Sequence, residues 1–332
     1  MRRYFRYHAR YGYQYIPGIQ ARVPHEAGAY LIRTNQSGFR SNHEYTPGRR
    51  EGMFRVALFG DSFTAADAVR NEDRFSDVAE RLMPGVEIDN FGLPGSGTDQ
   101  HLLIFEDEVV ATGADYDLIV IAVAVENIRR VVARLRPYQD DQGKLLYYEK
   151  PFFTLDAGGA LTLNNVPVPR HPVDPDAASA DDEAMVDQGG RFPLLRRISR
   201  ELELHDVLQR LTHYQPLPEY DDPAHPAWLV MRAILERWFA LARVPIVVFP
   251  LPLYQHVEET ASADAYRARF NELARPPAVV VHDPLPYFWR HEKAARRGFR
   301  FDKDIHPTPA AHAVLAHALA DAIRPRTGSR SA

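Results

Sequence analysis

The chain has 332 residues, of which 45% are hydrophobic and 25% are charged, so it is long and apolar enough to bury a large core. Its 40 basic and 44 acidic side chains give a formal net charge of −4, which argues against a general attraction to nucleic acid or anionic membranes. The absence of cysteine excludes disulfides, thiolate metal sites and a cysteine nucleophile.

The sequence predicts no transmembrane segment, because no stretch approaches the ~18 uninterrupted apolar residues that a spanning helix needs. Its first residues, MRRYFRYHARYGYQYIPG, carry the positive charge of a secretory signal but lack the apolar segment that follows one. We therefore expect a cytoplasmic protein, noting that an exported chain stripped of its signal would look the same.

Residues 1–50 are rich in Tyr, Arg and Gly and show no helical period, so we expect an N-terminal extension with hairpins laid on a larger domain. Tyr30–Thr34 is one strand-like fragment of it. The first ten residues contain a basic and aromatic cluster, which is formed by Arg2, Arg3, Tyr4, Arg6, Tyr7 and Arg10. This cluster is typical of a solvated, frayed terminus. The alternative is that it binds a sugar or a polyanion.

Beyond residue 50, short apolar runs alternate with helix-like stretches. The expected strands are Phe54–Phe59, Val86–Ile88, Leu118–Val125, Val244–Leu251 and Ala278–His282. The expected helices are Arg74–Leu82, Gln100–Ala111, Trp228–Ala242, Ala263–Leu273 and Ala310–Ile323. Apolar runs without alternation indicate strands covered on both faces, so the pattern predicts a doubly wound parallel α/β sheet.

The segment 136–225 interrupts this rhythm and is predicted to be an insertion or cap. It contains β-rich runs with turn signals, an acidic loop over Pro172–Asp187 and a helical stripe over Leu194–Leu211. The predicted organisation is an extension over 1–50, a catalytic α/β domain over 51–135 and 226–325, the insertion over 136–225 and a disordered tail over 326–332.

The most informative motif is Gly60-Asp61-Ser62-Phe63-Thr64, which directly follows the first predicted sheet strand. Open α/β sheets place their active sites at the carboxyl ends of strands, where a serine hydroxyl can face solvent. An ordinary strand-to-helix turn with Asp or Ser as the cap is the alternative explanation.

Three further blocks follow later elements. The loop Asn90–Thr98 is rich in glycine, so its amides can face a ligand. Glu126-Asn127 ends the most apolar strand, although Asn127 could also be a helix cap. Asp302-Lys303-Asp304-Ile305-His306 precedes the last helix, for which Thr308 is the expected N-cap.

In this order the four blocks resemble those of the SGNH hydrolases, also called the GDSL esterase/lipase family. The resemblance covers about residues 54–134 and 244–323 and implies a flavodoxin-like three-layer sandwich. It also implies that Ser62 is the nucleophile and His306 the base, with an oxyanion hole formed by Ser62, Gly95 and Asn127. No cofactor and no metal are implied.

The sequence departs from the family pattern in two blocks. The usual Gly-x-Asn-Asp of the third block is replaced by Val125-Glu126-Asn127-Ile128. The frequent Asp-x-x-His of the last block would put its acid at Lys303, so we expect Asp304 to orient His306 and keep Asp302 as the alternative acid.

Three other features of the sequence are candidates for a functional or a packing role. His101 is expected to be a surface histidine at a helix start, although it could line the cleft, and His312 is expected to pack or hydrogen-bond on the last helix. The aromatic residues Tyr147, Tyr148, Phe152 and Phe153 of the insertion are candidates for a sugar-stacking surface.

The resemblance and the residue types together predict a serine esterase that removes acyl groups, such as acetyl, from a carbohydrate-like or small polar ester. A serine needs a base near neutral pKa, a carboxylate must fix the imidazole tautomer, and preset donors must stabilise the oxyanion. The alternatives are an O-acyltransferase that modifies a sugar or polysaccharide and a binding module that has lost activity.

Overall fold

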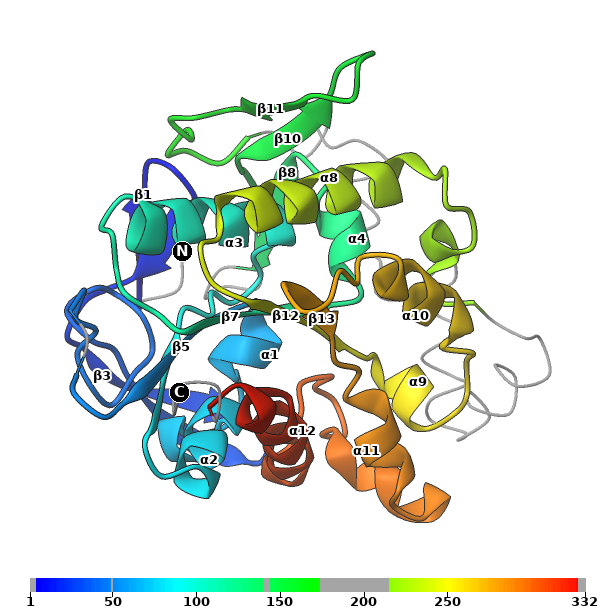
Figure 1. Ribbon diagram of the computed structural model, residues 1–332. Helices are drawn as coiled ribbons and strands as arrows, with labels where there is room; N and C mark the ends of the chain where they lie inside the picture. Colours follow the sequence, from blue (N-terminus) through cyan, green and yellow to red (C-terminus); the bar gives the residue numbers. More distant parts are fainter. Residues whose placement is uncertain (1–3, 49, 140–143, 174–214, 328–332) are drawn as a thin grey trace.

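The computed structural model describes residues 4–48, 50–139, 144–173 and 215–327. Its centre is a five-stranded parallel sheet with the strand order β13-β12-β7-β5-β6 (Figure 1). The strands are β5 (Phe54–Phe59), β6 (Val86–Asn90), β7 (Leu118–Ala124), β12 (Ile246–Leu251) and β13 (Val279–Val281). Every residue of β5, β7 and β12 is buried, which explains why these strands appear in the sequence as continuous apolar runs.

Helices cover both faces of the sheet. The α-helices are α1 (Ser62–Ala65), α2 (Phe75–Leu82), α3 (Thr98–Phe105), α4 (Asn127–Arg130), α8 (Pro226–Leu241), α9 (Tyr254–Val257), α10 (Asp264–Asn271), α11 (Leu285–Trp289) and α12 (Pro309–Thr327). Short 3₁₀ helices are η1 (Asn71–Asp73), η4 (Pro218–Tyr220) and η5 (Lys293–Phe299), and η2 (Glu106–Val110) is a π-helical turn. Helices α3 and α8 lie on one face, and α2 and α12 on the other (Figure 1). The predicted three-layer α/β sandwich is therefore confirmed.

The order of the strands places the site. The chain enters the sheet at β5, moves outward to β6, and then crosses to the other side of β5 to form β7, β12 and β13. This reversal creates a topological switch point at the carboxyl end of β5, where open α/β folds bind their ligands.

Four antiparallel hairpins surround the sandwich. In the N-terminal segment β1 (Phe5–His8) pairs with β2 (Gly12–Tyr15), and β3 (Gln20–His25) pairs with β4 (Gly28–Arg33). In the insertion β8 (Leu135–Gln139) pairs with β9 (Leu145–Glu149), and β10 (Phe152–Leu155) pairs with β11 (Leu161–Asn164). The expected hairpins of the extension are confirmed, and β10 lies against α3 and α8.

The expectation of a frayed N-terminus is wrong from Tyr4 onward. Residues of β1 pair with β2, and Arg10 forms ion pairs with Glu106 and Asp107 of the π-helical turn. Alternating aromatic residues of the β1–β2 hairpin also join the main core, which supplies the free energy that orders the segment. Residues 1–3 lie outside the described part of the chain.

The other end of the chain also carries more structure than expected. Helix α12 continues to Thr327, two residues into the predicted tail, and residues 328–332 lie outside the described ranges. The expected acidic loop from residue 174 onward and the stripe Leu194–Leu211 also fall outside them. None of the described helices combines the length and hydropathy that a bilayer-spanning segment requires.

Arg40 fastens the N-terminal segment to the sheet domain. Its fully buried guanidinium donates to the carbonyl oxygens of Ala65, Ala66 and Val69 at 2.9, 2.5 and 2.5 Å, and its Nε donates to Asn71 Oδ1 at 2.9 Å. These acceptors belong to the turn that follows α1, in which Ala66 has a left-handed φ of 62°. One buried cation therefore supplies hydrogen bonds to several carbonyl groups of a turn with left-handed backbone.

We predict that Arg40→Met lowers the free energy of unfolding by about 3 to 5 kcal/mol, because the buried carbonyl groups of the turn lose their donors. The control is Arg33→Met, which removes an exposed side chain 4.0 Å from Glu72 and should change stability by less than about 0.5 kcal/mol. Urea unfolding followed by circular dichroism measures both. Equal stability of the two variants would show that Arg40 is not the fastening residue.

Candidate active site

Ser62 lies at the switch point. It is the first residue of α1, three residues after the end of β5, and it is largely buried at 6% exposed. Asp61 caps the helix, because its Oδ1 accepts a hydrogen bond from the Phe63 N–H at 3.0 Å. The N–H of Ser62 has no partner within its own helix, as is true of every first helical turn, so it is available to an incoming ligand.

Asp304 and His306 lie on the loop that leads into α12. Asp304 Oδ1 is 2.5 Å from His306 Nδ1 and also accepts the backbone N–H of His306 at 2.9 Å. Since a carboxylate accepts only, the imidazole proton is on Nδ1 and Nε2 keeps its lone pair. Asp302 instead contacts Arg297 Nη2 at 3.0 Å with a side chain 90% exposed. The structure thus places Asp304, and not Asp302, against His306.

A cleft of about 740 Å³ brings most of the candidate residues together. It is lined by His25, Glu26, Ser62, Phe63, Asp67, Pro94, Gly95, Glu126, Arg130, Arg136, Lys303, Asp304, Ile305 and His306. Ser62, Gly95, Asp304 and His306 therefore share one cavity although they come from three separate parts of the sequence. The lining is rich in charged side chains, in contrast to the apolar core behind it.

Asn127 stands apart from this set. It begins α4 and is completely buried, while its neighbour Glu126 lines the cleft. Neither its Oδ1 nor its Nδ2 has a hydrogen-bond partner among the described residues. A buried carboxamide without partners is costly, so Asn127 calls for a functional explanation.

The backbone conformation at position 95 and the close approach of Arg136 both favour glycine. Its φ is +72°, and a Cβ there would lie 2.2 Å from Nη2 of Arg136. Arg136 donates to the Pro94 carbonyl at 3.1 Å and lies over the ring of Tyr13, 4.1 Å from its centroid. Sequence reasoning missed Arg136, because it lies on β8, a strand without a periodic signal.

The altered third block forms an ion network. Arg130 donates to Asp61 Oδ2 at 3.0 Å and to the Ser96 carbonyl at 3.1 Å, and it also forms a close ion pair with Glu126. Burial raises the pKa of Asp61 to about 6, and the charge of Arg130 limits that rise. Glu126, which precedes Asn127 in this block, thus helps to hold the arginine that neutralises the aspartate beside Ser62.

The carboxylates around His306 set its protonation. Burial alone would lower the pKa of His306, but the hydrogen bond that its Nδ1–H donates to Asp304 and the charges of Asp67 and Asp61 outweigh burial and raise that pKa above its usual 6.5. For Asp304 burial has the opposite effect and would raise the pKa. The hydrogen bonds that Asp304 accepts from His306 and His25 outweigh burial and hold that pKa well below the usual range. Asp304 therefore stays ionised at neutral pH and stabilises a protonated imidazole.

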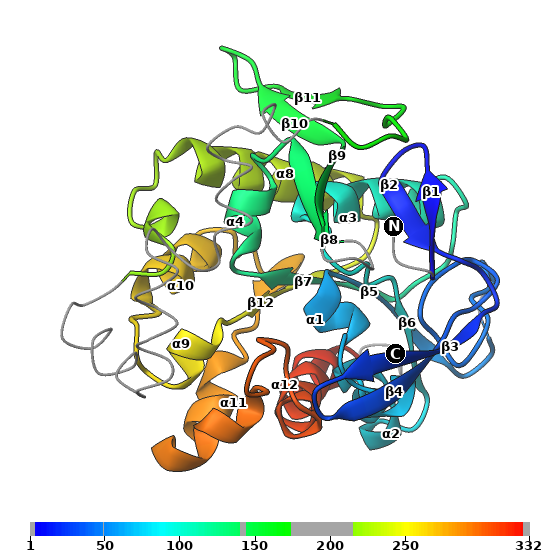
Figure 2. The ribbon, with the colours of Figure 1, turned by 180° about the vertical axis from the view of Figure 1, so that it is seen from behind.

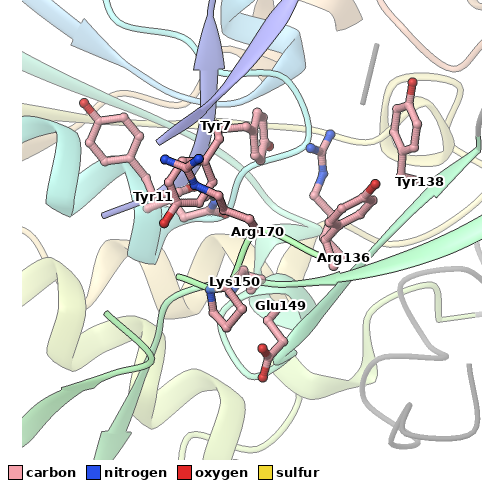
Figure 3. Close-up of a pocket in the computed structure, with 12 residues that line it drawn as sticks. Tyr7, Tyr11, Arg136, Tyr138, Glu149, Lys150 and Arg170 are labelled. Carbon is pink, nitrogen blue, oxygen red and sulfur yellow. Dashed lines mark hydrogen bonds between the residues drawn. The ribbon is translucent and has the colours of Figure 1, made fainter. Parts of the chain in front are cut away.

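A second pocket lies between the β1–β2 and β8–β9 hairpins (Figure 3). Its aromatic side chains include Tyr7, Tyr11, Tyr13, Tyr138 and Tyr148. Arginines cover two of these rings, since Arg136 lies over Tyr13 and Arg170 lies 4.3 Å from the centroid of Tyr7. Arg136 lines both this pocket and the cleft.

The structure corrects two sequence expectations. Tyr147 and Phe153 are buried, at 7% and 3% exposed, so of the four insertion aromatics they offer no stacking surface. His101 is fully buried rather than on the surface, and its Nε2 is 2.7 Å from Ser96 Oγ. The expectation for His312 is confirmed, because it is buried and accepts the Phe75 N–H at 3.3 Å.

Among the described residues, the potential metal ligands that lie together are His43, Glu87 and Asp89, with ligand atoms within 4.8 Å of one another. Arg55 already pairs with both carboxylates, at 3.2 Å from Glu87 and 2.9 Å from Asp89. These residues form a buried ion network in which an arginine supplies the positive charge.

Residues 58–314 match the model of the GDSL-like lipase/acylhydrolase family. Because the match spans most of the chain, this protein is a serine hydrolase, and it belongs to the GDSL-like lipase/acylhydrolase family. Membership implies hydrolysis of ester bonds. No curated protein sequence matches the chain.

Solved structures of similar proteins include a member of the lipolytic G-D-S-L family from Veillonella parvula, 11% identical with a TM-score of 0.43, which covers 82% of this chain and 99% of its own. The lipase Lip_vut3 from a goat rumen metagenome is 13% identical with a TM-score of 0.44, covering 84% of this chain and 99% of its own. A lipase/acylhydrolase from Enterococcus faecalis is 13% identical with a TM-score of 0.41, covering 82% and 97%.

We predict that Arg130→Met destabilises the fold more at pH 8 than at pH 5. An acid whose pKa is higher in the folded than in the unfolded chain costs stability increasingly as the pH rises toward its folded pKa. Asp61 already has a folded pKa of about 6, and without Arg130 that pKa rises further. The expected loss is about 1 kcal/mol at pH 5 and about 3 kcal/mol at pH 8.

Urea unfolding at the two pH values measures this difference. The matched control is Arg129→Met on the same helix, which removes a partly exposed partner of Glu219 and should cost under about 1 kcal/mol at either pH. A pH-independent loss in Arg130→Met would mean that Asp61 does not depend on this arginine.

Proposed function

We propose that this protein is a serine esterase that removes short acyl groups, such as acetyl, from a carbohydrate-like or small polar alcohol. Ser62 is the nucleophile, His306 the general base and Asp304 the residue that orients the base. The observation that carries the proposal is the 2.5 Å contact between Asp304 Oδ1 and His306 Nδ1 in the cleft that Ser62 also lines. It leaves Nε2 of His306 as an acceptor for the proton of the serine hydroxyl.

The reaction proceeds in two half-reactions. As Ser62 Oγ attacks the ester carbonyl carbon, His306 Nε2 takes the hydroxyl proton and later gives it to the departing alcohol. The acyl group is then bonded to Ser62. A water molecule loses its proton to His306 and attacks the acyl carbon, and the acid is released as His306 returns the proton to Ser62 Oγ, which restores the serine. Asp304 remains ionised throughout and stabilises the imidazolium that forms in each half-reaction.

Donors for the oxyanion come from three elements in this proposal. They are the N–H of Ser62 at the start of α1, the N–H of Gly95 and the side chain of Asn127. The unsatisfied carboxamide of Asn127 supports its role, because the oxyanion would supply the acceptor that the described residues lack. Removing one such donor typically costs about 3 kcal/mol of barrier.

The lining of the cleft supports a polar substrate. Charged residues such as Glu26, Arg136 and Lys303 outnumber its apolar ones, so the alcohol part of the ester meets groups that bind hydroxyls. The tyrosine-lined pocket of Figure 3 shares Arg136 with the cleft, but its volume of about 30 Å³ is too small for a sugar unit, so the alcohol part of the ester is assigned to the cleft itself.

An O-acyltransferase would use the same acyl-serine and replace water by a sugar hydroxyl. The two activities differ in the fate of the acyl group, so incubation with an activated acetyl ester, with and without sugar acceptors, separates them. Free acetate as the product in the presence of acceptors supports hydrolysis, and acetylated sugar as the main product supports transfer.

We predict that Ser62→Ala abolishes turnover of 4-nitrophenyl acetate while leaving the melting temperature near that of the wild type. The serine supplies the only bond to the acyl group in this mechanism, whereas Ser62→Ala removes a single oxygen atom from the side chain. Steady-state kinetics and thermal unfolding test both parts. Turnover by the variant at the wild-type rate would refute the proposed function.

We further predict that Asp304→Asn lowers kcat by about 10² to 10⁴-fold, because an amide at this position no longer fixes the Nδ1–H tautomer of His306. Asp302→Asn should change kcat by less than about tenfold, since Asp302 contacts Arg297 at the surface. Both variants are measured on the same activated ester. A larger effect of Asp302→Asn would reassign the acid.

A further inference from the structure

The β3–β4 hairpin of the N-terminal segment reaches the loop that carries Asp304 (Figure 2). His25, the last residue of β3, has its Nε2 at 3.2 Å from Asp304 Oδ2. Glu26 follows at the hairpin turn and accepts the backbone N–H groups of Lys303 and Asp304, each at 2.9 Å. Two consecutive residues of one hairpin therefore hold the side chain and the backbone of the same aspartate.

The hydrogen bonds of His25 define its tautomer. The backbone N–H of Ala27 donates to His25 Nδ1 at 3.2 Å, so Nδ1 is an acceptor and the ring proton is on Nε2. Nε2 therefore donates to Asp304. The ring is held in place by Phe301, whose centroid is 4.5 Å away in an edge-to-face arrangement.

These contacts give both oxygens of the Asp304 carboxylate a donor. Oδ1 accepts from His306 and Oδ2 accepts from His25. Rotation of the carboxylate would break both bonds together, so its plane is fixed, and with it the direction in which the imidazole of His306 points. A carboxylate bound on one oxygen only would have more freedom to rotate and to hydrate.

We propose that His25 is a positioning residue for the reaction: it locks the Asp304 carboxylate and thereby aligns His306 toward Ser62, while Glu26 anchors the backbone of the loop. This inference rests on the proposed function, since it assigns His25 a role in the same Ser62 chemistry. It also gives the N-terminal segment a direct part in the active site, which neither the four sequence blocks nor the family match assigns to it.

Two substitutions of His25 separate the hydrogen bond from the packing of the ring. His25→Phe keeps a ring against Phe301 but removes the donor. His25→Gln loses the ring but keeps an N–H donor at a similar distance from the backbone. The control is Arg22→Gln, an exposed residue of the same hairpin. The readouts are kcat and KM for 4-nitrophenyl acetate, melting temperature, and the residual rate of Ser62→Ala as the blank.

We expect His25→Phe to lower kcat about tenfold with KM unchanged, which corresponds to the loss of one hydrogen bond to a charged group. His25→Gln should stay within about threefold of the wild type, and Arg22→Gln should equal it. The inference is overturned if His25→Phe retains wild-type kcat, or if His25→Gln is the more damaging variant, because packing would then be the role of the ring. Turnover that survives Ser62→Ala would instead overturn the proposed function, and the inference with it.

Discussion

The hydrogen bond between Asp304 and His306 is the interaction on which the proposed chemistry depends. A neutral histidine has two tautomers, and only the one with its proton on Nδ1 presents a lone pair at Nε2. The 2.5 Å contact selects that tautomer, and in the proposed mechanism the ionised carboxylate stabilises the imidazolium formed when Ser62 gives up its proton. Around this pair, His25 and Glu26 hold Asp304, and the N–H groups of Ser62 and Gly95 are the backbone donors that we propose for the oxyanion.

Buried ion pairs neutralise the charged residues beside Ser62. Asp61, fully buried next to Ser62, depends on Arg130, and Arg130 is held in turn by Glu126. Such buried pairs do not stabilise a protein strongly by themselves, because each charge loses its hydration. Their role here is geometric, since they hold the turn around Ser62 in one arrangement.

The N-terminal segment belongs to this machinery although it precedes the sheet domain in sequence. Arg40 holds the turn after α1, Tyr13 donates its hydroxyl to the Pro94 carbonyl at 2.6 Å, and His25 reaches Asp304. The three contacts act on the three loops that carry the serine, the glycine and the histidine block. Deletion of the segment would therefore disturb the site from several sides at once.

The sequence predicted the sheet and four site blocks because their signals are local. Buried strands appear as apolar runs, and the motifs stand at strand ends where parallel topology must bring them together. It could not predict that His101 is buried, or that Arg136 and His25 enter the cleft. These positions depend on contacts between segments far apart in the chain, which leave no spacing pattern.

The most direct test of the account is the site of covalent labelling by a fluorophosphonate, a reagent that reacts with serine nucleophiles activated by a base. Intact mass followed by peptide mapping identifies the modified residue. The account predicts one adduct, on Ser62, which forms much more slowly in Asp304→Asn. An adduct on another residue, or labelling of Ser62 at an unchanged rate in Asp304→Asn, would contradict it.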